Sequence, residues 1–390
     1  MSINTTMKTA SVVIIGAGIS GAAIAYELAK RGQKDIILIE KNYPSSGATG
    51  RCGAGVRMQW GTEMNCRLTK YSIERFENLN QELGNDYDIE FKQGGYLMCA
   101  ATEKEFEQFK KNVKLQNSLG IPSRIIDEKE AKELIPYINT DHMIGGSFCP
   151  KDGHLNPFTT TLAYCKAAEK LGVEIQKYTT VISIDVKKGK IIGVQTDKEY
   201  ISTPIVVNAA GGWAQSIAKM VGVELPLTSQ RHQILVTEPV VPIQGPMFMG
   251  FVHNIYCQQT PHGSFIMGRG DEDEPWGEDM GHSWEFMERQ AKNVVRLLPL
   301  LKDLNIVRQW SGMYNYSPDK QPIYDAVPGV QGMYLAAGYS GHGFMLGPVT
   351  GIAMAEMILG VKHKDMTQDV SMLNFDRFKS GKLVIEPSVV

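Results

Sequence analysis

The chain has 390 residues, which is more than one hydrophobic core usually holds, so its length predicts two domains. Its composition, with 43% hydrophobic and 21% charged residues, is that of a globular protein and excludes the disordered and fibrous classes. The formal net charge of -2 provides no field that would attract nucleic acid or an anionic membrane surface. We therefore expect no nucleic-acid partner.

The six cysteines are scattered through the chain and form no CxxC pair. This spacing encodes neither a zinc knuckle nor a disulfide framework, and it favours reduced thiols. The apolar stretch 10–29 is broken by glycines and by Glu27, and Lys30 and Arg31 follow it, whereas a signal peptide carries its positive residues in front. We expect a cytoplasmic protein without a membrane span, and no motif requires a metal.

The N-terminus is typical of a dinucleotide-binding unit. Residues 11–15 and 36–39 are short apolar runs that predict strands buried in a parallel sheet, with a helix between them from about residue 18 to 30. In a GxGxxG turn the first glycine permits the tight turn, the second lets the backbone approach a pyrophosphate, and the third lets the helix pack against the strand. The turn here consists of Gly16, Ala17, Gly18, Ile19, Ser20 and Gly21.

Glu40 follows the second predicted strand, 19 residues after Gly21. A carboxylate in this place can accept hydrogen bonds from ribose hydroxyls, and its charge disfavours the extra phosphate of NADP. The motif therefore predicts a bound dinucleotide, and it leaves the choice between NAD and FAD open.

The rest of the chain alternates between helical and strand patterns. Helices are predicted at residues 62–83, where Thr62 is the expected cap, and at 103–119, 158–171, 284–298 and from about 346 onward. Strands are predicted around 173–177 and 181–185, as a pair, and at 205–209, 232–237, 255–258, 264–267 and 333–337. Glycine-rich segments end the strands at 205–209 and 333–337, where a backbone can approach a ligand closely.

Three segments carry a resemblance to a known superfamily. Residues 45–57 (SSGATGRCGAGVR) look like the second flavin-contact segment of the D-amino-acid oxidase and sarcosine oxidase superfamily. Residues 208–214 (NAAGGWA) resemble another of its signatures, and residues 338–345 (GYSGHGFM) resemble its C-terminal flavin loop. The match runs in the same order from about residue 11 to 360. Within the superfamily the chain is most similar to the beta subunits of heteromeric sarcosine oxidases and to dye-linked L-proline dehydrogenases.

The resemblance implies an α/β (α+β) fold of two interleaved domains. A Rossmann-like FAD-binding domain would comprise residues 8–84, 150–225 and 325–365. A mostly antiparallel β-sheet substrate domain would comprise residues 85–149 and 226–324. The flavin ring is then expected between the two.

FAD is the implied cofactor. Gly312 stands where the monomeric sarcosine oxidases carry the cysteine that bonds to flavin, so the FAD here is expected to be non-covalent. The motif and the resemblance together indicate FAD contacts at Gly16, Ala17, Gly18, Ile19, Ser20, Gly21, Glu40, Lys41, Gly47, Ala48, Thr49, Gly50, Arg51, Cys52, Gly55, Val181, Ala210, Gly211, Trp213, Gly338, Gly341, His342, Gly343, Phe344 and Met345.

The resemblance also implies a substrate site. Arg57 aligns with an arginine that clamps the substrate carboxylate, and a structural salt bridge is its alternative role. Tyr256 and Tyr314 align with substrate-pocket tyrosines and are otherwise core aromatics. His342 could orient the flavin or influence the substrate amine, or serve backbone packing. Met345 replaces a carboxylate-binding lysine, which leaves more of that task to Arg57.

The implied reaction is FAD-dependent oxidation of an amino acid with a secondary amine, such as sarcosine, proline, hydroxyproline or an opine, through loss of hydride from the α carbon to give an imine. Ile266 stands where the oxidases place an oxygen-activating lysine, which favours a dehydrogenase. Alternatives are a 2-hydroxy-acid dehydrogenase, a glycine or D-amino-acid oxidase, and a non-enzymatic FAD-stabilised subunit.

Electrons are then expected to pass to a partner subunit or carrier in a hetero-oligomer, with FMN at a subunit interface as a further implied cofactor. Heteromeric sarcosine oxidases hold FMN through a histidine. That position falls near Asn156 or Pro157 here, so a covalent FMN is not expected.

Overall fold

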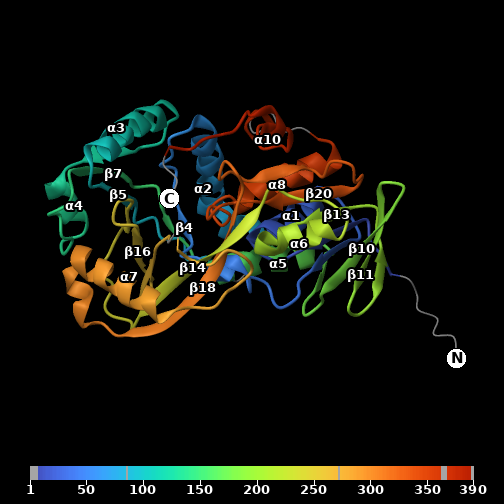
Figure 1. Cartoon of the computed structure of the whole chain (residues 1–390), viewed down its shortest axis with the longest axis horizontal. Coiled ribbons are helices and arrows are strands. Elements are labelled where there is room, and N and C mark those ends of the chain that lie inside the picture. Colours follow the sequence, from blue (N-terminus) through green and yellow to red (C-terminus); the bar gives the residue numbers. More distant parts are fainter. Residues whose placement is uncertain (1–7, 85–86, 271–272, 362–366, 388–390) are drawn as a thin grey trace.

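The computed structural model of the protein describes residues 8–84, 87–270, 273–361 and 367–387. The elements of a six-stranded sheet and those of an eight-stranded sheet lie on opposite sides of the molecule, with α2 and β4 between them (Figure 1). The predicted α/β fold class with two sheets of different kinds is confirmed.

The six-stranded sheet is parallel except at one edge, where β19 is antiparallel. Its order is β19 (Ile323–Ala326), β20 (Met333–Ala337), β13 (Val206–Asn208), β2 (Val12–Ile15), β3 (Ile36–Ile39) and β9 (Glu174–Gln176). Every residue of β2, β3 and β13 is buried. This burial explains their uninterrupted apolar sequences, because helices and strands cover both faces of such a sheet.

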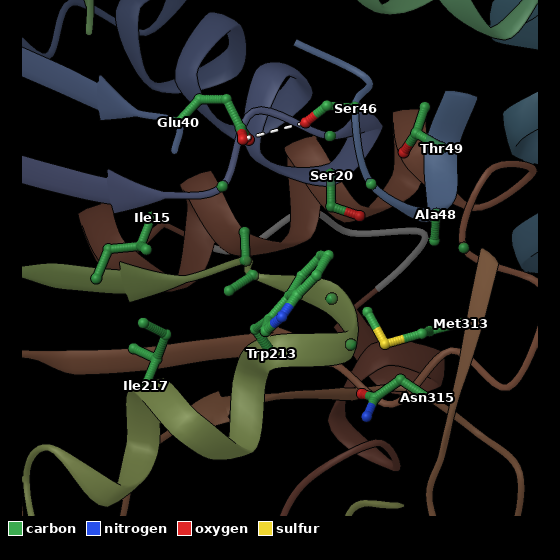
Figure 2. Close-up of a pocket in the computed structure, with 18 of the residues that line it drawn as sticks. Ile15, Ser20, Glu40, Ser46, Ala48, Thr49, Trp213, Ile217, Met313 and Asn315 are labelled. Atoms are coloured by element: carbon green, nitrogen blue, oxygen red, sulfur yellow. Dashed lines mark hydrogen bonds between the residues drawn. The ribbon is translucent and has the colours of Figure 1, made fainter. Parts of the chain in front are cut away.

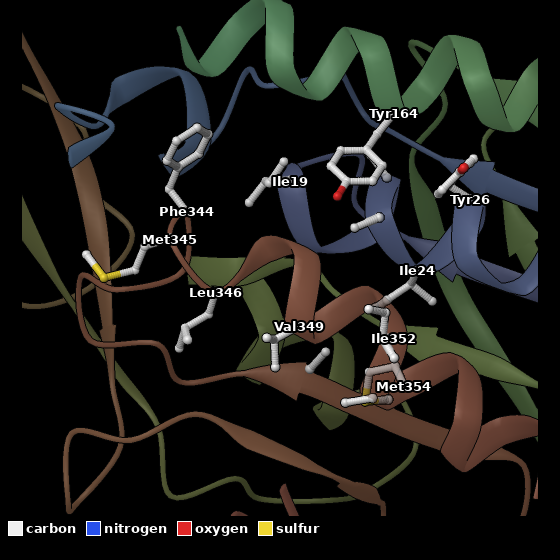
Figure 3. Packing of buried hydrophobic residues seen from close by; sticks show 14 of the residues in the cluster. Ile19, Ile24, Tyr26, Tyr164, Phe344, Met345, Leu346, Val349, Ile352 and Met354 are labelled. Carbon is white, nitrogen blue, oxygen red and sulfur yellow. The ribbon is translucent and has the colours of Figure 1, made fainter. Parts of the chain in front are cut away.

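Three helices pack together on this sheet: α1 (Ile19–Lys30), α5 (Pro157–Lys170) and α8 (Gly347–Leu359). Figure 3 shows Ile24 of α1 near Ile352 and Met354 of α8, in one buried cluster with the rings of Tyr26 and Tyr164. The small residues of α1 and α8 let their backbones approach closely. The dinucleotide turn is thereby held against a rigid support.

The eight-stranded sheet contains only one parallel pair, β15 with β5. Its order is β18 (Ile306–Tyr316), β14 (Thr228–Thr237), β17 (Phe265–Gly268), β16 (Ile255–Gln259), β15 (Met247–Gly250), β5 (Tyr96–Ala100), β7 (Gly145–Cys149) and β6 (Arg124–Ile126). Its helices are α3 (Glu103–Ser118), α4 (Glu128–Leu134) and α7 (Trp284–Leu297). The predicted antiparallel strands at 232–237, 255–258 and 264–267 are confirmed as β14, β16 and β17.

The remaining elements are smaller, apart from α2 (Glu63–Leu83), which begins after Thr62 as predicted. A four-stranded sheet contains β1 (Lys8–Thr9), β12 (Tyr200–Ser202), β11 (Lys190–Thr196) and β10 (Val181–Lys187). The others are β4 (Gly55–Val56), β8 (Gly153–His154), α6 (Ala214–Lys219), α9 (Thr367–Ser371), α10 (Asp376–Ser380) and the 3-10 turns η1 (Ala48–Arg51), η2 (Gly211–Trp213) and η3 (Pro299–Asp303).

One prediction about strand pairing is wrong. β9 and β10 do not pair with each other, because β9 adds to the edge of the six-stranded sheet beside β3, and β10 pairs with β11. The sequence signal for the true hairpin is the turn Lys188-Gly189, where both residues have positive φ angles of 52° and 74°. Such a turn matches the twist of two antiparallel strands.

The division into two domains stays a proposal. The eight-stranded sheet uses residues between 96 and 316, and the six-stranded sheet uses residues on both sides of them and from 174 to 208. The proposed boundaries at 85 and 365 lie outside the described residues. All six cysteines are free. In the described ranges, no helix combines the length and apolar character that crossing a bilayer requires.

Candidate active site

A cavity of about 330 Å³ runs past the carboxyl ends of β2, β3 and β13, the edge at which parallel sheets bind ligands (Figure 2). Eighteen residues from the predicted sites line it: Gly16, Gly18, Ile19, Ser20, Glu40, Lys41, Gly47, Ala48, Thr49, Cys52, Val181, Ala210, Gly211, Trp213, Tyr314, Gly341, Gly343 and Phe344. We call this the dinucleotide cavity.

The turn from β2 into α1 depends on two glycines. Gly16 has a φ of +104°, and a Cβ atom there would lie 2.6 Å from the carbonyl oxygen of Ala209. A Cβ atom on Gly21 would lie 1.9 Å from the carbonyl oxygen of Gly16, so the helix could not approach the strand. The first turn of α1 contains no acidic residue, and its N-cap makes no side-chain hydrogen bond. The positive end of the helix dipole is therefore available to a phosphate at this edge of the sheet.

The carboxylate of Glu40 is buried at the end of β3. Its Oε2 accepts a hydrogen bond of 2.9 Å from the backbone N–H of Ala17, and its Oε1 accepts bonds from the N–H of Asn42 and the hydroxyl of Ser46 (Figure 2). These donors orient the carboxylate beside the glycine turn. It can then accept further hydrogen bonds from ribose hydroxyls in the cavity.

Lys41 and Trp213 come from distant segments and stack at the cavity wall. The Nζ atom of Lys41 lies 3.4 Å from the centroid of the Trp213 ring. Partial burial lowers the pKa of Lys41, and the nearby charge of Glu40 opposes that shift. The pair closes the cavity on the side of the Trp213 indole, a contact that the separate segments in the sequence could not reveal.

A second cavity, of about 90 Å³, adjoins the first and shares Cys52, Tyr314, Ser340, Gly341 and Phe344 with it. We call it the substrate cavity. It brings together all four residues predicted to contact substrate: Arg57, Tyr256, Tyr314 and His342. Gly55 and Met345, predicted as flavin contacts, line this cavity and not the dinucleotide cavity.

Arg57 follows β4 and is only 2% exposed. Its guanidinium stacks 4.2 Å from the Trp60 ring centroid, and its Nη1 lies 3.2 Å from the sulfur of Met249. Burial raises the pKa of Tyr96 to about 12, while a hydrogen bond and the charge of Arg57 act in the opposite direction. A buried cation with aromatic neighbours in a small cavity is suited to bind a carboxylate.

A buried carboxyl lies behind Arg57. Burial raises the pKa of Asp152 to about 7, against the opposing effects of the Met58 N–H, the Gln59 amide and the Arg57 charge. Asp152 accepts hydrogen bonds of 2.8 Å from Met58 and 3.0 Å from Gln59. It thereby holds the backbone that follows Arg57.

His232 was not predicted, yet it lies in the wall of the substrate cavity. Its ring stacks between Tyr314, at 4.1 Å, and Tyr256, at 5.9 Å, and its Nε2 lies 3.3 Å from the Tyr256 hydroxyl. Burial lowers the pKa of His232 to about 3, so the imidazole is neutral. The available sequence signal was a polar residue at an inward-facing position of a buried strand.

His342 lies in the loop between β20 and α8. Its ring packs edge-on against Trp60 with centroids 4.6 Å apart. Burial, with smaller contributions from the positive charges of Arg57 and Lys320, lowers its pKa to about 3. The neighbouring Gly341 has a φ of +96°, and a Cβ there would lie 2.5 Å from the Tyr314 ring, so a side chain would displace the cavity wall.

Five predicted cofactor residues line neither cavity: Ala17, Gly21, Gly50, Arg51 and Gly338. The Arg51 guanidinium donates to the carbonyl oxygens of Ser46 and Ser311, and so fastens the η1 turn to β18. The other four provide backbone close to the cavities. They therefore shape the site without facing it.

Five residues of the three resemblance segments line the dinucleotide cavity although they were not named as contacts: Ser46, Ala209, Gly212, Tyr339 and Ser340. Nine further lining residues were not predicted: Ile15, Ile39, Thr179, Thr180, Ser216, Ile217, Met220, Met313 and Asn315. Asn315 illustrates the difficulty. Its amide accepts from the N–H of Gly338 and donates to the hydroxyl of Ser229, so it joins β18 and β14 to the glycine loop. Only the β18–β14 pairing creates this role.

Gly312 and Ile266, two positions at which the sequence comparison found a different residue from the oxidases, lie in different surroundings. Gly312 lies beside η1, where a Cβ atom would be 3.2 Å from the Cβ of Arg51. Ile266 is partly buried on β17 and lines neither cavity. Within the parts of the chain that the structure describes, no group of three or more potential metal ligands occurs.

The residues around the dinucleotide cavity fit FAD. A phosphate-binding turn at a helix start, an oriented buried carboxylate and an apolar extension toward the substrate cavity follow one another along a single channel. Fold and site define a protein that binds a dinucleotide on a Rossmann-like sheet and a small molecule beside it, between that sheet and an antiparallel one.

Comparison with known proteins gives the family. Residues 11–357 match the family described as "DAO: FAD dependent oxidoreductase", and the chain belongs to this family. FAD is its cofactor, as predicted. Among solved structures, the chain is similar to L-proline dehydrogenase from P. horikoshii, with 37% identity, a TM-score of 0.91, and coverage of 97% of this chain and 100% of that chain.

Two curated relatives differ in length. Sarcosine oxidase subunit beta from Rhodobacter capsulatus is 28% identical over 97% of this chain and 91% of its own length. The mitochondrial pyruvate dehydrogenase phosphatase regulatory subunit from Mus musculus is also 28% identical over 98% of this chain, but the chain spans only 45% of that protein. The superfamily recognised from the sequence is confirmed.

Proposed function

We propose that the protein oxidises a small amino acid with a secondary amine, such as sarcosine, proline, hydroxyproline or an opine, and converts it to an imine. The observation that carries this proposal is the buried Arg57 in a small aromatic cavity that opens onto the dinucleotide cavity. The similarity to an L-proline dehydrogenase and a sarcosine oxidase subunit supports the same class of substrate.

The chain would hold FAD through three groups of residues. The glycine turn and the start of α1 would receive the pyrophosphate, and Glu40 the ribose hydroxyls. The segments around Gly47 and Gly341 would enclose the ring system, next to the substrate cavity. When bound, FAD supplies the acceptor for two electrons.

Arg57 would bind the substrate carboxylate through its planar guanidinium, which can donate two parallel hydrogen bonds. The walls formed by Tyr96, Met249, Tyr256 and Tyr314 would surround the aliphatic part and exclude water. The volume of about 90 Å³ favours a compact side chain or a ring. The α carbon is then oriented toward the neighbouring cavity.

Oxidation removes a hydride from the α carbon, which bound FAD would accept, and the nitrogen lone pair forms the C=N bond of an iminium ion. Loss of the N–H proton to water then gives the neutral imine. The amine must therefore be a free base. His232 and His342 are neutral at ordinary pH, because burial lowers both pKa values to about 3. They add no positive charge that would repel an iminium product.

Two other reactions use the same features. A carboxylate clamp also accepts a 2-hydroxy acid, and a primary amine such as glycine or a D-amino acid would fit a cavity of this kind. A non-enzymatic subunit is a third candidate, and the match to a phosphatase regulatory subunit favours testing it. It predicts bound flavin that no substrate reduces.

We propose that electrons leave the protein through a redox partner in a hetero-oligomer, not mainly through oxygen. Phe158 and Tyr43, 51% and 50% exposed, border a surface depression of about 240 Å³. The Phe158 ring packs against Gly50 of η1, and the η1 turn separates this ring from the dinucleotide cavity. An exposed apolar patch so close to the cofactor suits a docking partner.

FMN at that interface belongs to the same proposal. The Asn156 side chain caps α5, where it accepts hydrogen bonds from the N–H groups of Phe158 and Thr159. A carboxamide has no nucleophilic nitrogen like that of an imidazole, so any FMN would be held non-covalently.

The test is anaerobic titration of the purified holoprotein with sarcosine, L-proline, D-proline, hydroxyproline, glycine and lactate in turn, following the visible absorbance of the flavin. Bleaching by a secondary amino acid is expected. Bleaching by lactate alone would establish the 2-hydroxy-acid reaction. Bleaching by none of them would favour the non-enzymatic subunit.

A further inference from the structure

From α10 to residue 387, where the described part of the chain stops, the chain returns to the middle of the molecule and reaches the start of α2 (Figure 1). It is fastened first at Asp319, just beyond β18. The buried guanidinium of Arg377 donates to both carboxylate oxygens of Asp319, at 2.8 and 3.1 Å, and the N–H of Val384 donates to one of them. Residues 377–387 thereby form a strap, which we call the C-terminal strap.

Glu386 forms the second attachment of the strap and is only 7% exposed. Its Oε1 accepts a hydrogen bond of 2.7 Å from the N–H of Gly61. Its Oε2 accepts from the N–H and the hydroxyl of Thr62, at 3.1 and 2.8 Å, and from the side-chain amide of Asn65 at 2.9 Å. One buried carboxylate thus satisfies four donors at the start of α2, where the helix dipole also favours a negative charge.

The residue before Gly61 is Trp60, whose indole supports the substrate cavity from behind. The indole N–H of Trp60 donates to the carbonyl oxygen of Arg57 at 3.0 Å, and the indole ring stacks on the Arg57 guanidinium. The same indole also packs edge-on with the His342 ring. A shift of Trp60 would therefore move both Arg57 and His342.

We propose that Glu386 is a positioning residue for the substrate-carboxylate clamp. It fixes Gly61 and Thr62, these fix Trp60, and Trp60 holds Arg57 in the orientation needed to bind a carboxylate. The proposal rests on the function proposed above. It assigns a role in substrate binding to a residue beyond the matched family region, which ends at residue 357.

Removal of the carboxylate leaves two backbone N–H groups without their acceptor in a buried place, which costs free energy unless the loop moves. Movement of the loop is what would misplace Arg57. Misplacement by about 1 Å can reduce the rate roughly a hundredfold. Glu386→Ala should therefore weaken carboxylate binding by about tenfold or more, and Glu386→Gln, which keeps one acceptor oxygen, by less.

The chain offers a matched control in Glu105. Its Oε2 accepts from the N–H groups of Ala101 and Thr102 and from the Thr102 hydroxyl, at the start of α3. This set of donors is close to that of Glu386, and Glu105 lines neither cavity. Glu105→Gln removes the negative charge from a helix cap of the same kind without touching the clamp.

The experiment compares the holoproteins of the wild type, Glu386→Gln, Glu386→Ala and Glu105→Gln at equal flavin content. Three kinds of measurement are made. The first is affinity and turnover, as the Kd of acetate and the KM and kcat of the best secondary amino acid. The second is hydrogen exchange of a peptide that covers residues 57–65, and the third is the rate at which an arginine-selective dicarbonyl reagent modifies Arg57. The Glu386 variants should show weaker binding with a smaller change in kcat, faster exchange, and faster modification. Glu105→Gln should match the wild type in all three.

Unchanged modification of Arg57 in both Glu386 variants would overturn the proposal, as would affinity losses no larger than those of Glu105→Gln. If the wild type binds no acetate and oxidises no amino acid, the proposed function fails. Exchange and modification then still decide whether Glu386 positions Arg57, because neither measurement requires a substrate.

Discussion

The two adjoining cavities are built in opposite ways. The dinucleotide cavity is walled mainly by short contiguous segments, such as residues 18–20 and 209–213, in which backbone and glycines predominate. The substrate cavity takes single side chains from distant places, with Arg57 after β4, His232 on β14 and Tyr256 on β16. The first construction recognises a cofactor mainly through backbone shape, and the second makes the choice of substrate depend on a few side chains.

This comparison predicts that backbone changes in the first cavity abolish cofactor binding. Gly16→Ala places a Cβ atom 2.6 Å from the carbonyl oxygen of Ala209 at a φ of +104°. We expect protein without bound flavin and a loss of about 1–3 kcal/mol of stability from backbone strain. The measurements are flavin content after purification and the free energy of unfolding.

Gly32→Ala is the matched control, since Gly32 has a φ of +90° but no atom within 4 Å of the added Cβ. It should share the strain and retain the flavin. Full flavin content in Gly16→Ala would show that close backbone contact is not what forms this cavity.

A side-chain change in the second cavity should separate substrate from cofactor. Arg57→Lys keeps the charge but loses the planar pair of donors, so kcat/KM should fall by about ten- to a hundredfold, which corresponds to roughly 1.4–2.8 kcal/mol. Steady-state kinetics and the visible flavin spectrum are the two measurements. The spectrum and flavin content should stay those of the wild type. Loss of flavin in this variant would mean that the cavities are not independent.

A buried histidine outside both cavities should affect stability alone. Burial, with the charge of Lys92, lowers the pKa of His154 from 6.5 to about 4. As the pH falls, His154 takes up a proton in the unfolded chain before it does so in the folded one. Its contribution to stability is therefore fully present above about pH 6.5 and is lost as the pH falls toward 4. We expect His154→Asn to reduce this loss by about 1–2 kcal/mol at about pH 5.

The measurement is denaturant unfolding between about pH 5 and 8, in which the slope against pH matters more than the absolute stability. Burial raises the pKa of Asp152 to about 7, so that group contributes stability that is lost as the pH rises from 3.8 toward 7. The contribution of Asp152 to the pH dependence is opposite in sign to that of His154. It is the same in the wild type and in His154→Asn, so the difference between their slopes does not contain it. Equal slopes would contradict a neutral buried His154.

The smallest expected effect concerns the pH profile of activity. With the pKa values of His232 and His342 lowered to about 3, the rise of kcat/KM with pH should reflect only the free base of the substrate amine. His232→Asn should lower kcat/KM without moving the midpoint of that rise. A profile that is flat from about pH 6 to 10 would argue against the free-base step, and a displaced midpoint would argue against the neutral imidazole.

The sequence by itself determined the dinucleotide unit, because its signals are local. The Gly16 to Gly21 turn, two buried strands and Glu40 lie within 40 residues, and each has one physical role that its residue type reveals. The helix at 19–30 was predictable from the glycine turn between two apolar runs, and the helix at 63–83 from its cap, Thr62, and its apolar spacing. Resemblance then added Arg57, Tyr256, Tyr314 and His342, which the fold does bring together.

Only the tertiary structure decided the contacts between distant segments. Three such contacts join residues from 24 to 325 positions apart. His232 stacks on two tyrosines, Lys41 packs on the Trp213 ring, and Glu386 accepts a hydrogen bond from Gly61. No local pattern marks such partners, since a histidine, a tryptophan or a glutamate has many possible roles until its neighbours are known. The pairing of β9 with β3 was not predicted for the same reason, because the neighbour of a strand depends on which sheet edge is free where the chain returns.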